Sequence, residues 1–167
     1  MSLELNIEKI GSIARQKEKE NLRFRSFLKG LDSDKVDIIV HRLHQEIVEQ
    51  IDCTECGNCC NNLKPLVNDN EIERLSQIDN LPVEEFKIRF TELDDIDDGR
   101  YLKDIPCKYL MNKKCIIYSS RPKDCKSYPH THKKNFTSRT LGMIYSVEIC
   151  PIVFNIFERL KSELRFR

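Results

Sequence analysis

Four cysteines crowded into eight residues are the part of the sequence best suited to chemistry: Cys53, Cys56, Cys59 and Cys60. A spacing of two residues lets one turn of backbone bring two sulfurs to one metal ion, and Zn²⁺ takes four such ligands in a tetrahedron. Gly57 permits the left-handed backbone conformation that such turns use. Adjacent cysteines usually point in different directions, so Cys59 and Cys60 are expected to serve two sites, or one site and a separate thiol.

Four further cysteines follow at Cys107, Cys115, Cys125 and Cys150. Eight thiols could complete two four-sulfur sites, and the sequence does not fix which cysteines share a site. Sulfur-only ligation fits Zn²⁺ or an iron–sulfur cluster and disfavours Mg²⁺ and Ca²⁺. We therefore predict all eight cysteines as metal ligands, with Zn²⁺ as the preferred ion and a 4Fe–4S cluster as the alternative.

Length and composition limit the class of protein. The chain has 167 residues, a formal net charge of +1 and 33% charged residues, which fits one domain with a real core. The N-terminal residues mix acids and bases, unlike a signal peptide, and no apolar run approaches the ~18–20 residues of a membrane span. We expect a cytoplasmic protein with no membrane part, where reducing conditions favour metal or redox cysteines over disulfides.

Apolar spacing predicts that helices position these cysteines. In chain order the predicted elements are a helix over 3–29, a second helix capped by Ser33, short helices begun by Asn68 or Asp69 and by Pro82, a small hairpin within 101–118, and a last helix from Pro151. The predicted fold class is mainly α with a small β-hairpin, stabilised by metal. Residues 1–52 are expected to form a helical hairpin and residues 53–167 a cysteine-cluster domain, packed together as one unit.

Basic side chains concentrate in the segment 99–139, which has 11 lysines and arginines against 2 acidic residues. This segment could neutralise the acidic stretch before it, offset the negative charge of thiolate sites, or dock an acidic protein partner. Nucleic-acid binding is not expected, because the charge of the whole chain is nearly balanced. The oligomeric state stays open.

The four histidines form two pairs in the sequence. His41 and His44 are three residues apart and share a helix face, where we expect a surface or interface pair rather than a metal site. His130 and His132 lie in a loop close to Cys125 in sequence. They are better candidates for a spare ligand or for a hydrogen-bond donor to a ligand.

Two charged residues beside the later cysteines also have two interpretations each. Arg121 either donates a hydrogen bond to a thiolate or shapes the turn with Pro122. Asp124 either acts as a base next to Cys125 or is an ordinary surface acid, which is the interpretation we favour.

Several separate blocks of sequence together resemble the YkgJ-type cysteine-cluster family, which has a Cys-x2-Cys-x2-Cys-Cys signature and is described as a zinc- or iron-chelating domain. The blocks are 53–60, 106–110, 115–118, 121–125 and 128–129. The resemblance covers roughly residues 50–155. It implies that the chelating cysteines of the family correspond to Cys53, Cys56, Cys59 and Cys60, to Cys107, Cys115 and Cys125 by block, and to Cys150 as the last family cysteine.

The resemblance also sets the expected function. A related cysteine domain occurs in flagellin lysine N-methylases, which are longer proteins, and this chain has no obvious room for a separate methyltransferase domain. We therefore expect a protein that binds Zn²⁺ or an iron–sulfur cluster through clustered thiolates. The alternative is an iron–sulfur redox component or a methylase-like component of protein modification, and whether the chain is an enzyme stays open.

Overall fold

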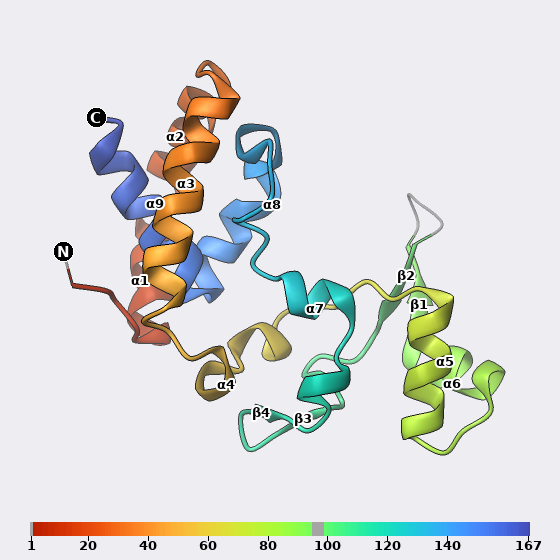
Figure 1. Cartoon of the computed structure of the whole chain (residues 1–167). Coiled ribbons are helices and arrows are strands. Elements are labelled where there is room, and N and C mark those ends of the chain that lie inside the picture. The colour runs from red at the N-terminus through yellow and green to blue at the C-terminus, as the bar shows by residue number, and fades with distance from the viewer. Residues whose placement is uncertain (1, 95–98) are drawn as a thin grey trace. The chain divides into compact units, whose positions relative to one another are not determined.

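The computed structural model describes residues 2–94 and 99–167, which form helices and short pairs of antiparallel strands (Figure 1). The chain separates into two units. Residues 1–53 and 129–167 form the helical unit, and residues 54–128 form the cysteine unit. The predicted fold class, mainly α with a small β-hairpin, is confirmed.

The helical unit joins segments from both ends of the sequence. Its helices are α1 (Ile7–Gln16), α2 (Glu18–Lys29), α3 (Ser33–Val48), α8 (Phe136–Ile149) and α9 (Pro151–Glu163). Helix α8 packs against the other four, and α3 packs along α9. In the described part of the chain no single helix has the length and apolar composition of a membrane span; α8 and α9 meet that description only as a pair bent by 116°.

Aromatic side chains fill the core of the helical unit. Phe24 of α2, Phe136 of α8 and Phe157 of α9 are fully buried. The ring of Phe157 lies edge-on to Phe24 at 5.9 Å and to Phe136 at 6.0 Å. One side chain of the last helix therefore contacts helices from both parts of the sequence.

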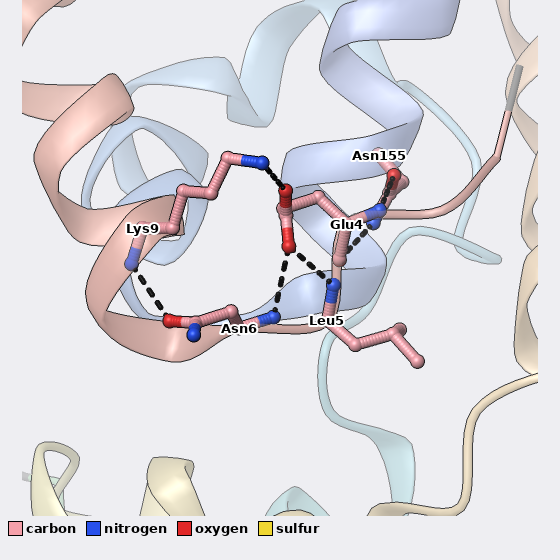
Figure 2. A network of polar contacts seen from close by, with 5 residues as sticks. All are labelled: Glu4, Leu5, Asn6, Lys9 and Asn155. Atoms are coloured by element: carbon pink, nitrogen blue, oxygen red, sulfur yellow. Dashed lines mark hydrogen bonds and ion pairs between the residues drawn. The ribbon is translucent and has the colours of Figure 1, made fainter.

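Polar contacts fix the chain before α1 to α9 (Figure 2). The backbone N–H of Glu4 donates to Oδ1 of Asn155 at 3.0 Å, and the Asn155 amide donates back to the Glu4 carbonyl at 2.8 Å. The Glu4 carboxylate also accepts the N–H groups of Leu5 and Asn6 and pairs with Lys9. This network orients the first turn of α1, which Asn6 caps by accepting the Lys9 N–H.

The start of α8 is capped by a residue from α3. The carboxylate of Asp37 accepts the backbone N–H groups of Asn135 at 2.6 Å and Phe136 at 2.9 Å, and Asp37 is buried. A buried carboxylate that accepts two orphan N–H groups stabilises both the helix end and the loop before it. The loop 129–135 is thereby tied to α3.

The cysteine unit contains the shorter elements of the chain. They are η1 (Asn58–Asn61), α5 (Asp69–Ile78), α6 (Val83–Phe90), β1 (Thr91–Leu93), β2 (Arg100–Leu102), β3 (Leu110–Met111), β4 (Lys114–Cys115), η2 (Tyr118–Ser120) and α7 (Lys123–Ser127). Helix α4 (Cys53–Cys56) spans the boundary of the two units. A small core of Ile72, Leu75, Phe86, Leu102 and Tyr109 lies beneath α5, α6 and β2.

The first predicted helix is wrong in one respect, because residues 3–29 do not form one continuous helix. At Lys17 the backbone leaves the helical conformation, with ψ at 12°, and α1 ends there. The Lys17 N–H still donates to the carbonyls of Ile13 and Arg15. The Lys17 side chain pairs with Glu158 of α9. The cap of α3 also differs from the prediction. Asp32 rather than Ser33 is the N-cap, and its carboxylate accepts the N–H groups of Asp34 and Lys35.

The strands differ from the prediction as well. The hairpin of β3 and β4 is shorter than predicted, with Leu110 opposite Cys115 and a tight turn at Asn112 and Lys113, both at positive φ. The predicted strand at residues 101–102 belongs to β2, which pairs with β1 so that Thr91 lies opposite Leu102. Pairing of β1 with β2 therefore takes the place of one larger hairpin.

Candidate metal centre

Four thiols from four places in the cysteine unit act on one another: Cys60, Cys107, Cys115 and Cys125. The pKa of Cys125 is raised to about 12, mostly by burial and in part by the negative charges that Cys60, Cys107 and Cys115 would carry. Burial likewise raises the pKa of Cys107 to about 11, with smaller contributions from Cys60 and Cys115. These four residues, called here the thiol cluster, are thus close enough for the charge of each to affect the others.

Backbone hydrogen bonds connect three members of the thiol cluster. The Cys107 N–H donates to the Cys60 carbonyl at 2.8 Å, which joins the end of η1 to the segment before β3. The Leu110 N–H then donates to the Cys107 carbonyl at 2.9 Å, and Leu110 pairs with Cys115 across the hairpin. Residues far apart in sequence are thereby linked through a few peptide groups.

The fourth member, Cys125, lies on α7, which is held by polar contacts with the rest of the unit. The buried carboxylate of Glu71 accepts the Lys123 N–H at 2.6 Å at the start of α7. Asp124 accepts the Leu66 N–H at 3.1 Å, and Arg74 donates to the Ser120 carbonyl at 3.0 Å just before α7. This contact gives Asp124 a structural role that neither of its two interpretations included.

Replacing Glu71 by Ala should therefore loosen α7 together with α5. The Glu71 carboxylate also accepts the Asn68 N–H at 3.0 Å in a capping box, so two N–H groups would lose their acceptor. We expect a loss of about 1–3 kcal/mol in the free energy of unfolding, measured by denaturant titration. The exposed Glu73 on the same helix supplies the control, and Glu73→Ala should change stability by less than about 0.5 kcal/mol. Equal losses in the two variants would contradict this role for Glu71.

Gly57 fixes the backbone of the cysteine run against the hairpin. Its φ is +58°, and a Cβ atom placed on it would lie 2.3 Å from the carbonyl oxygen of Lys113. Both the left-handed conformation and this close approach require glycine. The prediction that Gly57 uses its conformational freedom is confirmed, whereas the approach to Lys113 had no signal in the sequence.

Gly57→Ala is expected to destabilise the cysteine unit by about 1–3 kcal/mol or more, because strain and a backbone clash add. Gly142 in α8 is a matched control, since a Cβ there would meet nothing within 4 Å. Gly142→Ala should be neutral or stabilising by up to about 1 kcal/mol. Thermal unfolding of both variants checks the difference, and a neutral Gly57→Ala would show that the two backbones are not in contact.

Of the two predicted roles of Arg121, its hydrogen bond with Tyr118 supports the shaping of the turn. Its guanidinium donates to the Tyr118 carbonyl at 2.8 Å and stacks 3.6 Å from the centre of the Tyr118 ring, so it shapes the turn. Its positive charge also lowers the pKa of Cys60 and Cys115, against stronger effects that raise them. The charge of Arg121 therefore favours thiolates in the thiol cluster.

The thiol of Cys60 has the most strongly raised pKa of the cluster. A hydrogen bond with the adjacent Cys59 thiol contributes most, followed by burial. At neutral pH such thiols stay protonated unless a cation compensates their charge. A thiophilic divalent ion does this, because it binds thiolates and releases their protons. Donor type and number thus fit the tetrathiolate sites of zinc proteins.

The other cysteines are placed differently. Cys53 and Cys56 are the two ends of α4, with Cys53 exposed, and Cys59 lies beside Cys60 in η1. Cys150 belongs to the helical unit, where it is 7% exposed at the junction of α8 and α9. All eight cysteines are among the described residues, and none forms a disulfide.

Within residues 2–94 and 99–167, no group of three or more His, Cys, Asp or Glu side chains is arranged so that it could hold a metal ion. The thiol cluster is therefore a set of neighbouring thiols and not a formed metal site. Which of the eight cysteines are ligands stays a prediction.

Comparison with known proteins gives one result. The family CxxCxxCC, described as a "putative zinc- or iron-chelating domain", matches residues 52–142, which include the thiol cluster and the first four cysteines. No curated protein and no solved structure matches the chain. Since the matched segment is more than half of the sequence, the chain belongs to the CxxCxxCC family of zinc- or iron-chelating domains.

Proposed function

We propose that the chain binds Zn²⁺ through the thiol cluster and that the ion serves mainly to stabilise the cysteine unit. The observation that carries this proposal is a group of four partly buried thiols whose pKa values are raised first by burial or, for Cys60, by the hydrogen bond with Cys59, and then by one another's charge. A tetrahedral ion bound to four thiolates removes this repulsion. Four protein ligands leave no open position for water, which favours a structural over a catalytic site.

Each neighbouring residue has a defined part in this proposal. Arg121 reduces the negative charge of the tetrathiolate centre, and Gly57 and Glu71 hold η1 and α7 in position. Zn²⁺ would supply the bonds that tie η1, β4 and α7 together. Cys56 and Cys59 of the same unit would supply thiolates toward a second ion, in line with the prediction of two sites.

The proposal also covers the cellular compartment and a protein partner. Eight cysteines that form no disulfide suit the reducing cytoplasm. Within the basic segment, Lys108 pairs with Asp79 and Lys114 pairs with Glu55 of the same unit. These pairs favour internal neutralisation for the two lysines, and docking of an acidic protein on the remaining basic residues stays a prediction.

Metal and acid-labile sulfide analysis of anaerobically purified protein, together with its visible spectrum, tests the proposal. We expect at least one zinc ion per chain, no sulfide and no absorbance near 400 nm. Iron with matching sulfide would instead establish a cluster and turn the search to the redox or protein-modifying alternative. Protein that contains neither metal and gains no stability from added Zn²⁺ would refute a metal-binding role.

A further inference from the structure

All four histidines of the chain come from two neighbouring segments of the helical unit. His41 and His44 lie on α3, and His130 and His132 lie in the loop 129–135 that Asp37 ties to the same helix. The rings of His44 and His132 are 5.3 Å apart between centroids, at 48° to each other. The sequence separates these two residues by 88 positions, and the fold brings them together outside the thiol cluster.

Buried polar contacts hold the His44 ring in place. Its Nδ1 lies 2.8 Å from the hydroxyl of Thr131, and Thr131 is fully buried. When that nitrogen donates to the hydroxyl, Nε2 presents its lone pair, which is the arrangement of histidine ligands whose other nitrogen is hydrogen-bonded. The loop is fixed further by Arg139, which donates to the His130 carbonyl at 3.0 Å.

The nearby His41 has a defined tautomer. Its Nε2 lies 3.3 Å from the Lys133 carbonyl oxygen. Because a carbonyl can only accept, this nitrogen carries the proton, and the neutral ring has its lone pair on Nδ1. A further imidazole nitrogen able to accept a metal therefore lies one helical turn from His44.

Neutral imidazoles are favoured at this place. Burial lowers the pKa of His44, and the charges of His132 and His41 lower it further. The pKa of His132 is lowered by burial first, and then by His130, Lys133, His41 and Arg139. Both rings are therefore uncharged at neutral pH, with lone pairs available for a metal ion.

We propose that His44 and His132 form a second metal site, separate from the thiols, for a divalent transition-metal ion of the class of Zn²⁺, Ni²⁺ and Cu²⁺. Imidazole nitrogen suits these ions, whereas Mg²⁺ and Ca²⁺ prefer oxygen. Two imidazoles are the core of the site and water completes its coordination, since no third side chain in the described residues has ligand geometry. Thr131 is the positioning residue.

Titration of the full-length protein with Ni²⁺ tests this site, after the thiols have been loaded with a limiting amount of Zn²⁺ that leaves the histidines unoccupied. Calorimetry measures the binding, and NMR reports on the histidine ring nitrogens. We expect one additional Ni²⁺ per chain, with the His44 and His132 signals affected first. His44→Gln and His132→Gln should each weaken this binding at least tenfold. Thr131→Val should weaken it about tenfold. Thr140→Val, a change at an equally buried threonine of α8, should not.

Two results would overturn the proposal. One is wild-type protein that takes up no Ni²⁺ beyond its thiol-bound metal. The other is equal broadening of all four histidine signals with affinity unchanged in both glutamine variants, which would indicate adventitious surface binding. The NMR measurement on the wild-type protein keeps the test decisive if a variant fails to fold.

Discussion

Cys125→Ser is expected to release the metal ion of the thiol cluster and to unfold much of the cysteine unit. A serine hydroxyl does not replace a thiolate as a zinc ligand, so three sulfurs would remain. Structural zinc contributes on the order of 10 kcal/mol, which is comparable to the whole stability of a domain. Metal content by mass spectrometry should fall by one ion per chain, and hydrogen exchange across residues 54–128 should accelerate strongly.

The control for this experiment is the same substitution at a cysteine of the helical unit. The sequence predicts Cys150 as a ligand, but it is buried at the start of α9 and is not a member of the thiol cluster, so the proposed zinc site does not include it. Cys150→Ser should therefore retain the wild-type metal content while losing a little stability. Metal loss in Cys150→Ser and retention in Cys125→Ser would reverse our assignment and return Cys150 to the ligand set.

Phe157→Ala should give the largest loss of stability in the helical unit, about 3–5 kcal/mol. The side chain is fully buried, and its ring contacts Phe24 and Phe136. Its removal leaves a cavity where α2, α8 and α9 meet, and neighbours in a packed core close such a space only partly. Chemical denaturation followed by circular dichroism should show the helical transition at a much lower denaturant concentration.

Leu141 on α8 provides the comparison, since its side chain is 63% exposed. Leu141→Ala removes apolar atoms without opening a cavity and should change stability by no more than about 0.5 kcal/mol. If Phe157→Ala were equally mild, the three rings would not share one core.

Local signals in the sequence predicted several elements well. Asn68 caps α5, which buries Ile72 and Leu75, and Pro151 begins α9 at its first position. These features depend on residues within one or two turns of each other. Such short-range chemistry needs no knowledge of the tertiary fold.

Helix α8 had no such signal and was not predicted. Its buried face includes Thr137, Thr140 and Ser146, so an apolar period is hard to recognise. Its N-terminal cap comes from Asp37, which is 98 positions before Asn135 in the sequence. The helix is thus specified by tertiary contacts rather than by its own residues.

The sequence predicted which residue type forms the candidate site, but not how the cysteines are grouped in space. Cysteine type and spacing indicated metal chemistry, yet the grouping of Cys60 with Cys125 depends on contacts of Glu71 and Asp124 with distant backbone. The sequence also assigned residues 129–167 to the cysteine domain, whereas in the structure they group with the first 53 residues. Long-range packing decides both features.

The discontinuous course of the helical unit has a consequence for biosynthesis. Helix α3 packs along α9, but a ribosome completes α9 only after the whole cysteine unit has been made. Residues 1–53 of a nascent chain therefore wait with part of their apolar surface uncovered while residues 54–128 emerge. During that interval the thiols can bind a metal ion. A folded cysteine unit would then shorten the flexible loop that must close before the helices assemble.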